Sequence, residues 1–212
     1  MSTRERILAE ATRQLTSVGY AAFTIAGVRD ALGLSSGSMF HAFSSKPALA
    51  AGVYVAGMTD YQRAATAAIA RAAGPEDALR AWIATHLAWI EDHRDLARFL
   101  FATLPDEVAA EAAGPLKAHN DMFYEALSSM FAQAEQAGLV GRLDRGVAQV
   151  ICISPAHEYG RRWAQGQLET TPRKLTRVLQ EASLAALAAT RVPRNLRGTK
   201  TSSSSRRKER SR

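Results

Sequence analysis

Apolar residues recur at helical spacing through most of this chain, and short breaks rich in glycine and proline separate the recurring stretches. In the first stretch, for example, Ile7, Ala11 and Leu15 fall on one side of a helix. Alanine dominates the apolar residues, while clusters of the β-branched and aromatic residues typical of strands are sparse. The pattern therefore predicts an all-α fold.

The breaks set the bounds of the predicted helices. The first helix begins at a capping box of Ser2 and Glu5 and ends at Gly19. A long fourth helix begins at Ser45 and runs to about Ala73. We expect the remaining helices at 24–33, from 35 or 36, from 76, and at 94–104, 106–113, 116–137, 144–166 and 172–190.

Positive charge is concentrated at the C-terminal end. Residues 191–212 contain nine Lys or Arg and one Glu, which is more positive charge than the net +7 of the whole chain. Because this tail has almost no apolar residues, we expect it to be disordered. Two interpretations stay open: the tail adds non-specific affinity for nucleic acid phosphates, or it serves only as a solubilising end.

Several classes of protein are disfavoured by what the sequence lacks. No apolar stretch reaches the ~18 residues that a membrane span needs. Motifs of zinc peptidases, phosphate-binding loops and hydrolase nucleophile elbows are missing, and His157 and Glu158 are adjacent, so on a helix they point about 100° apart. Cys152 is the only cysteine and lies in an apolar run, which favours a buried side chain. We expect a cytoplasmic protein with no catalytic residue, metal or cofactor.

The segment from Thr24 to Leu49 predicts a helix-turn-helix. Gly33 supplies the left-handed backbone conformation that a sharp turn needs. The next helix starts with small residues, Ser36 to Ser38, which let its amide-rich N-terminus approach a phosphate-lined groove closely. Such a pair of short helices is typical of DNA-binding proteins.

These residues resemble the tetracycline-repressor (TetR) family of bacterial regulators, over residues 3–54. The resemblance is carried, in order and at the family's spacing, by Thr24, Gly33-Leu34-Ser35, Gly37, Met39-Phe40, Phe43 and Ser45-Lys46. It implies an N-terminal three-helix helix-turn-helix domain, joined by a long helix to a helical bundle for dimerisation and ligand binding. It also implies a dimeric, sequence-specific transcriptional regulator, a repressor released by a small apolar effector.

The resemblance assigns roles by position. Thr24 caps its helix and binds a backbone phosphate, and Lys46 binds another. Phe40 stands where the family usually has Tyr, so it can pack on the DNA backbone without donating a hydrogen bond, while Phe43 is expected in the core. The predicted DNA-binding residues are Thr24, Arg29, Ser35, Ser36, Gly37, Ser38, Phe40, His41 and Lys46.

Two positions depart from the family pattern. Val28-Arg29 replaces the usual Ile-Ala pair, so that a long cation stands where a small residue packs. Arg29 either extends outward to a phosphate or signals a different local packing. Gly27 lowers helix propensity, and the sequence shows no contact that requires it.

The last two helices are the predicted dimer interface, because by resemblance they form a four-helix bundle across a two-fold axis. Such a dimer places two recognition helices in major grooves about 34 Å apart, or a multiple of it, on a palindromic operator. Packing within one chain is the other use of these apolar faces. The predicted interface residues are Val147, Ile151, Ser154, Val178, Ala182, Ala185 and Ala189.

Aromatic residues gather between residues 82 and 163, with a few polar residues among them, and the resemblance places an effector pocket there. Aromatic walls with few polar anchors suit a small-molecule site, although the same pattern also occurs in an ordinary core. The predicted pocket residues are Trp82, His86, Trp89, Phe99, Phe123, Tyr124, His157 and Arg161.

The predicted organisation is a DNA-binding domain at 1–50, a dimerisation and effector domain at 51–190, and the basic tail at 191–212. The main alternative function is non-specific architectural binding of DNA, which the basic tail alone would support. Activation instead of repression stays open as well.

Overall fold

Nine α-helices and one short 3-10 helix make up most of residues 1–191, which are the residues that the structure, a computed structural model, describes. They are α1 (Thr3–Ala22), α2 (Ile25–Leu32), α3 (Ser36–Ala42), α4 (Lys46–Ala70), α5 (Pro75–Asp92), α6 (Arg94–Leu100), α7 (Asp106–Gln136), α8 (Arg145–Ala164), η1 (Pro172–Leu175) and α9 (Thr176–Ala189). No strand occurs in this part of the chain, so the all-α prediction is confirmed. The predicted basic tail lies, apart from Arg191, outside the described residues.

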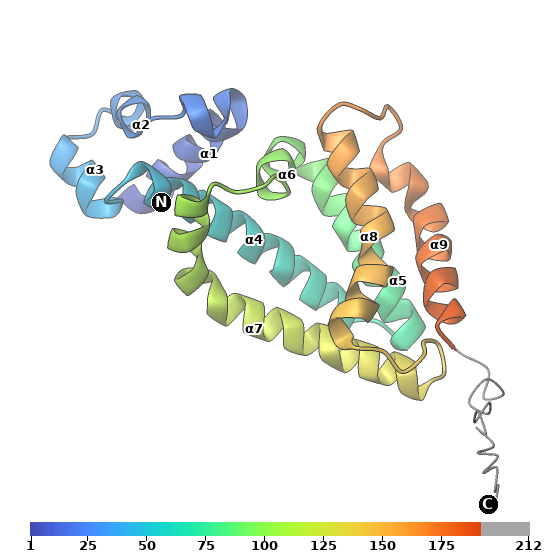
Figure 1. The fold of residues 1–212 in the computed structure, drawn as a ribbon. Coiled ribbons are helices and arrows are strands. Elements are labelled where there is room, and N and C mark those ends of the chain that lie inside the picture. The colour runs from blue at the N-terminus through green and yellow to red at the C-terminus, as the bar shows by residue number, and fades with distance from the viewer. Residues whose placement is uncertain (192–212) are drawn as a thin grey trace, which may run out of the picture.

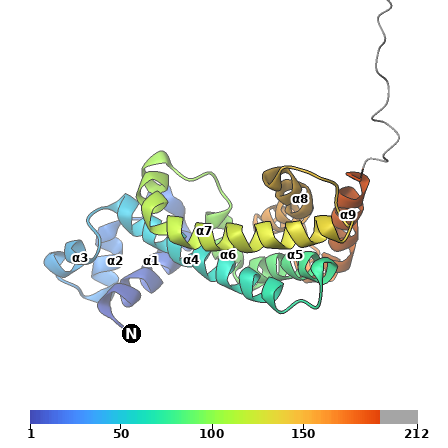
Figure 2. The same ribbon diagram turned by 90° about the horizontal axis from the view of Figure 1, so that it is seen from below.

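The helices divide between two ends of the molecule. Figure 1 shows α1, α2 and α3 at one end and α8 and α9 at the other, with α4 and α7 running between them, and Figure 2 shows the same order from below. None of the helices within residues 1–191 combines the length and hydropathy needed to cross a membrane.

Helix starts follow the capping signals in the sequence. The Ser2 hydroxyl accepts a hydrogen bond from the Glu5 amide (3.2 Å), and the Glu5 carboxylate accepts one from the Ser2 amide (2.7 Å), which confirms the capping box. The Ser45 hydroxyl likewise accepts from the Ala48 amide (3.1 Å) at the start of α4. These local bonds satisfy amides that have no partner within their helices.

Several predicted bounds are wrong. Helix α7 runs without interruption through Gly114 and Pro115, where the sequence predicted a break between 106–113 and 116–137. Proline in a helix interior removes one backbone hydrogen bond, and Figure 1 shows α7 changing direction after its first turns. Buried Ala112 and Leu116 hold the helix on both sides of the proline. Helix α4 ends at Ala70 and α6 at Leu100, three and four residues before the predicted ends.

Gly19 does not end α1 as predicted. Its backbone has φ 74° and ψ 167°, which produces a kink, and one further turn runs to Ala22. The positive φ at Gly19 is favoured by the lack of a side chain. The kink brings the chain to Thr24, where α2 begins.

Two hydrophobic clusters share α4 and α7. The N-terminal core contains Ile7, Ala11, Leu15, Phe23, Val28, Met39, Phe43, Leu49, Ala50, Ala51, Val53, Val108 and Ala112. The larger C-terminal core is built around α5 and includes Trp82, Ile83, Ile90, Phe131 and Cys152. Tyr54, Leu96 and Phe99 pack against both clusters, so the two ends are joined by continuous apolar contact. Cys152 is buried as predicted, and its burial raises the pKa of the thiol to about 12.

Candidate nucleic-acid interface and ligand cavity

Helices α2 and α3 form the helix-turn-helix, and three small residues, Thr24, Gly33 and Ser35, cap their ends. The Thr24 hydroxyl accepts from the Gly27 amide (3.0 Å) and so caps α2. Gly33 ends α2 in the left-handed conformation (φ 62°, ψ 34°), as the sequence predicted. The Ser35 hydroxyl then accepts from the Ser38 amide (3.1 Å) and caps α3.

Helix α3 buries Met39 and leaves its opposite face uncovered. Met39 lies in the N-terminal core, and Phe43, directly after the helix, is buried there as well, as predicted. The Arg4 guanidinium lies 4.2 Å from the centre of the Phe43 ring and donates to the Ala42 carbonyl (2.7 Å), which fixes the end of α3. The predicted DNA-binding residues Ser35, Ser36, Gly37, Ser38, Phe40 and His41 are all exposed.

Arg29 connects the two helices of the motif. Its Nε donates to the Asp30 carboxylate (2.8 Å), and its Nη1 donates to the Ser36 hydroxyl (3.3 Å) at the start of α3. The guanidinium therefore lies beside the N-terminus of α3, while its side chain stays about one third exposed (34%). The sequence allowed two interpretations of Arg29, a phosphate contact or a different local packing. The structure shows in addition its hydrogen bond to Ser36, which holds the start of α3 next to α2.

Lys46 is fixed next to the start of α2. Its ammonium donates to the Ala21 carbonyl (3.2 Å) and lies 4.6 Å from the centre of the Tyr20 ring. Lys46 is thus held against the end of α1, and Thr24 follows three positions after Ala21 at the start of α2. Cationic and hydroxyl groups at helix N-termini suit the binding of anions.

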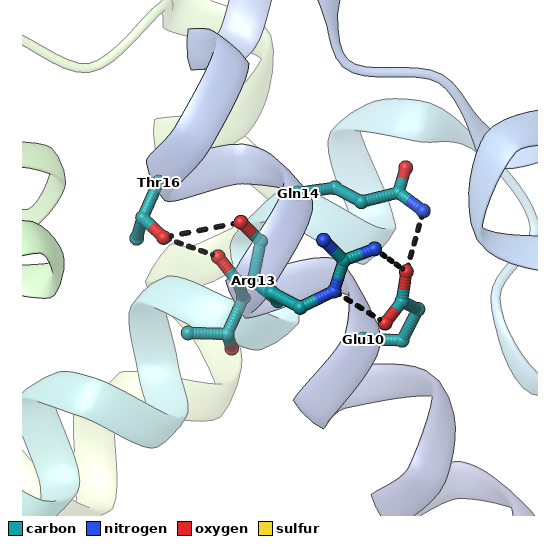
Figure 3. Close-up of polar contacts among 5 residues, drawn as sticks. Glu10, Arg13, Gln14 and Thr16 are labelled. Carbon is teal, nitrogen blue, oxygen red and sulfur yellow. Dashed lines mark hydrogen bonds and ion pairs between the residues drawn. The ribbon is translucent and has the colours of Figure 1, made fainter. Parts of the chain in front are cut away.

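Gly27 makes room for a side chain of α1. A Cβ at this position would lie 2.8 Å from Gln14 Oε1 and 3.2 Å from the Thr24 hydroxyl. Figure 3 shows Gln14 and Arg13 both held by the Glu10 carboxylate, and Gln14 Nε2 donates to it over 2.7 Å. The hydrogen bonds from Arg13 and Gln14 lower the pKa of Glu10. A larger residue at position 27 would displace the end of the Gln14 side chain, a contact between helices that the sequence did not reveal.

A cavity of about 220 Å³ lies between α4, α5, α7 and α8. Five predicted pocket residues line it: Trp82, His86, Phe123, Tyr124 and His157. The other residues that line it are Tyr54, Met58, Tyr61, Gln62, Phe101, Leu116, Asn120, Gln149 and Ile153.

Three predicted pocket residues lie elsewhere. Trp89 donates to the Asp60 carboxylate (2.9 Å) and stacks on His93. Phe99 packs edge-on against Tyr54, and Arg161 pairs with Glu158 on the surface of α8 (2.8 Å). Neither Trp89, Phe99 nor Arg161 lines the cavity. The helical spacing of aromatic residues did not indicate which of them point inward.

The sequence also missed Tyr61 and Gln62, which α4 contributes to the cavity from outside the aromatic segment 82–163. Trp82 Nε1 donates to the Tyr61 hydroxyl oxygen (3.1 Å), and the same hydroxyl is hydrogen-bonded to His86 Nδ1, 2.9 Å away. Gln62 Nε2 donates to Asn120 Oδ1 (2.6 Å). Within the described residues, His86 Nε2 and Gln62 Oε1 have no hydrogen-bond partner although both atoms are buried.

Burial also keeps the histidines of the cavity uncharged near neutral pH. Desolvation lowers the pKa of His86 to about 3, and the nearby His157 ring adds to this effect. The pKa of His157 is lowered mainly by burial and then by the charge of Arg161. Burial raises the pKa of Tyr61 as well, so its hydroxyl stays protonated.

The predicted dimer face is uncovered in this chain. Val147 and Val178 are 48% and 60% exposed, and Ser154, Ala182, Ala185 and Ala189 are exposed as well, whereas Ile151 is half-buried. Figure 1 shows α8 and α9 side by side at the end of the molecule away from α1–α3. The opposite sides of the same helices are buried through Ala148, Cys152, Ala156, Ser183 and Leu187. Each helix therefore has one face in the core and one apolar face toward solvent.

No group of three or more His, Cys, Asp or Glu side chains positioned to hold a metal ion occurs among residues 1–191.

Comparison with known proteins gives a family match for the N-terminal helices. The model of a family described as "Bacterial regulatory proteins, tetR family" matches residues 7–53, which include α2 and α3. No curated protein matches the sequence.

Solved structures share the fold over most of the chain. A bacterial regulatory protein in the tetR family from Rhodococcus RHA1 is 20% identical, covering 88% of this chain and 98% of that chain, with a TM-score of 0.68. The fatty acid degradation regulator FadR from Bacillus halodurans is 16% identical, covering 87% and 95%, with a TM-score of 0.73. FadR from Bacillus subtilis, in complex with stearoyl-CoA, is 16% identical, covering 86% and 98%, with a TM-score of 0.72. Likeness at this level of identity shows the fold.

Replacing Tyr61 with Phe will test the polar network of the cavity. Tyr61→Phe leaves Trp82 Nε1 and His86 Nδ1 without their shared partner, so we expect the free energy of unfolding to fall by about 2 kcal/mol. Tyr159→Phe is the matched control, because the Tyr159 hydroxyl donates to the Thr170 carbonyl (2.7 Å) at an exposed site, and we expect it to lose less than about 1 kcal/mol. Urea unfolding measures both, and equal losses would contradict this account.

Stability will fall on mild acidification because of the buried histidines. The unfolded chain binds a proton at His86 below a pH of about 6.5, whereas the folded chain does so only near a pH of about 3. Lowering the pH from 7 to 5.5 will therefore reduce the free energy of unfolding by about 1 kcal/mol through His86 alone. His86→Gln removes this contribution, so its stability will depend less on pH in urea unfolding. An unchanged pH dependence in that variant would contradict the prediction.

Proposed function

We propose a function on the premise that this chain belongs to the tetR family of bacterial regulatory proteins and binds DNA through its helix-turn-helix. The proposed protein is a dimeric, sequence-specific repressor that binds a palindromic operator and is released by a small apolar molecule. The observation that carries the proposal is the start of α3, where small residues stand exposed between Thr24 and Lys46.

DNA contact is proposed at the nine residues predicted from the sequence. Gly37 supports this, because no atom other than the Ser35 hydroxyl, at 3.9 Å, lies within 4 Å of the place where its Cβ would be. A DNA backbone or base edge can therefore approach the start of α3 closely. Phe40, which is 54% exposed, offers a ring for packing on the sugar-phosphate backbone. Arg29, Lys46 and Thr24 supply charge and hydroxyl groups for phosphates on either side.

Dimerisation is proposed through the exposed apolar faces of α8 and α9. A single helix-turn-helix binds one half-site, so a palindromic operator requires two copies related by a two-fold axis. The exposed valines and alanines of these helices form a surface of the kind that a second copy covers in a helical interface.

Release by an effector is proposed to act through α7. Leu116, Asn120, Phe123 and Tyr124 of this helix line the cavity, while Val108 and Ala112, earlier in it, lie in the N-terminal core. A further tie is the hydrogen bond from the Tyr20 hydroxyl to the Glu107 carboxylate (3.0 Å). A ligand that favours another position of α7 thereby favours another position of the recognition helices, which lowers operator affinity.

Selection of bound fragments from random DNA tests the proposal. We expect a palindromic consensus that survives removal of residues 192–212, with weaker affinity and a shallower dependence on salt because fewer phosphates are neutralised. Loss of the consensus together with the tail, or equal affinity for the consensus and for random duplex, would instead favour non-specific architectural binding.

A paired substitution tests the role of α3 directly. Gly37→Leu places bulk where we propose DNA approaches, so affinity for the selected operator should fall roughly tenfold or more, since one set of base contacts is worth about 1–3 kcal/mol. Ala9→Leu, at an exposed position of α1, is the control and should leave affinity unchanged. Thermal unfolding confirms that both variants fold, and equal operator affinities would contradict the assignment.

A charge on the proposed interface should separate the dimer. Val178→Asp buries an unpaired carboxylate twice in a two-fold interface, so we expect dimerisation to weaken by about 3 kcal/mol or more. Met122→Asp is the control, because Met122 is 69% exposed on α7, outside the α8–α9 face. Sedimentation velocity measures the dimer fraction. A dimer lost in Met122→Asp but kept in Val178→Asp would place the interface elsewhere.

A further inference from the structure

The cavity between α4, α5, α7 and α8 has no charged side chain in its lining. Its fourteen lining residues include no Asp, Glu, Lys or Arg. The nearest cationic and anionic groups of α8, Arg161 and Glu158, are paired with each other on the surface. A charged ligand would lose its hydration on entering without gaining an opposite charge. The lining therefore selects against carboxylates, phosphates and ammonium groups.

Two buried polar atoms in the lining have no hydrogen-bond partner. His86 and Gln62 are only 2% and 5% exposed, and the unpartnered atoms are His86 Nε2 and Gln62 Oε1. Trp82 Nε1 can only donate to the Tyr61 hydroxyl, so we assign that hydroxyl's own proton to His86 Nδ1; in this tautomer His86 Nε2 carries the ring proton and is a donor. Gln62 Oε1 is an acceptor, and the bond from Gln62 Nε2 to Asn120 Oδ1 fixes which end of the amide is the oxygen. Both residues line the cavity, so these two atoms are the candidate donor and acceptor for a ligand bound there.

The remaining lining limits the size and shape of the ligand. The volume of about 220 Å³ exceeds the roughly 150 Å³ that accommodates benzene in an apolar cavity. Tyr61, Trp82, Phe101, Phe123 and Tyr124 supply aromatic surface around it. A compact molecule of one or two rings fits this volume and these walls.

We infer that this cavity binds an uncharged compound of one or two rings that carries a hydroxyl group. The hydroxyl oxygen accepts a hydrogen bond from His86 Nε2 and its proton is donated to Gln62 Oε1, while the rings contact the aromatic walls. The inference rests on the proposed function, because it names the class of effector for the site already proposed there.

Calorimetric titration of the full-length protein with matched probes tests the inference. Phenol, cyclohexanol and 2-naphthol carry the hydroxyl, naphthalene lacks it, and 2-naphthoate replaces it with a charge. We expect 2-naphthol to bind roughly tenfold more tightly than naphthalene, since a hydroxyl satisfies both buried groups, and 2-naphthoate to bind more weakly than either. Naphthalene binding as tightly as 2-naphthol, tighter binding of 2-naphthoate, or no binding of any hydroxyl probe would each overturn the inference.

Two variants locate the preference in the cavity. In Gln62→Met and in His86→Phe, the preference for 2-naphthol over naphthalene should fall to within about twofold. Gln133→Met, at an exposed position of α7, is the control and should keep the full preference. Gln62→Met tests the inference even if His86→Phe does not fold, because Asn120 is only half-buried and keeps access to water. A preference retained in Gln62→Met would overturn the inference.

Operator binding measured in parallel separates the two proposals. If 2-naphthol binds as expected but leaves operator affinity unchanged, the ligand class stands and effector release fails. If a palindromic operator is bound but no hydroxyl probe binds, the DNA-binding function stands and the ligand class fails.

Discussion

The arrangement of this molecule depends on the apolar contacts that α4, α6 and α7 make with the N-terminal core. Val108 and Ala112 are buried in the same cluster as Ile7, Leu15 and Met39, although about seventy residues or more separate them along the chain. Helix α6 contributes as well, because Leu96 and Phe99 pack against the same cluster. The helix-turn-helix and the cavity are therefore parts of one packed structure, because α4 and α7 contribute to both. Interiors packed in this way shift between discrete arrangements and do not deform continuously.

The hydrogen bonding of the buried polar groups is a second constraint on the structure. The Tyr61 hydroxyl is hydrogen-bonded to both Trp82 and His86. The other ring nitrogen of His86, Nε2, has no hydrogen-bond partner within the described residues. Natural interiors seldom leave such groups unpaired, and a binding site is one of the few reasons to retain them. In the proposed site, the neutral histidines and the absence of charge in the lining would favour selection by hydrogen bonding and shape.

Much of the fold was predictable because its signals are local. Ser2, Thr24, Gly33 and Ser45 act as caps over three or four residues, and the sequence shows each of them directly. The helix-turn-helix depends on the same short-range chemistry. Proline is also a local signal, but it was misleading at Pro115, where burial on both sides of the residue outweighed its preference to end a helix.

The cavity was predictable only in part, because it depends on which helices meet. The residue types of the aromatic segment correctly predicted His86, Phe123 and His157 as lining residues. Trp89 and Phe99 are aromatic residues of the same segment, but they do not line the cavity. Tyr61 and Gln62 come from α4, whose pattern suggested only a connecting helix. Gly27 makes the same point on a smaller scale, since its close contact with Gln14 of α1 appears only once the two helices are packed together.

Helix α3 has one buried position and several exposed ones, and this has a consequence for divergence among related proteins. Within this short helix only Met39 is fully buried, and the Ser35 cap and the buried Phe43 flank it on either side. The exposed positions between them contribute little to the core, so they can be exchanged with little loss of stability. Under the proposed function, such exchanges would alter which base sequence is preferred while the scaffold stays the same, so a duplicated copy could acquire a new target before anything else in it changes.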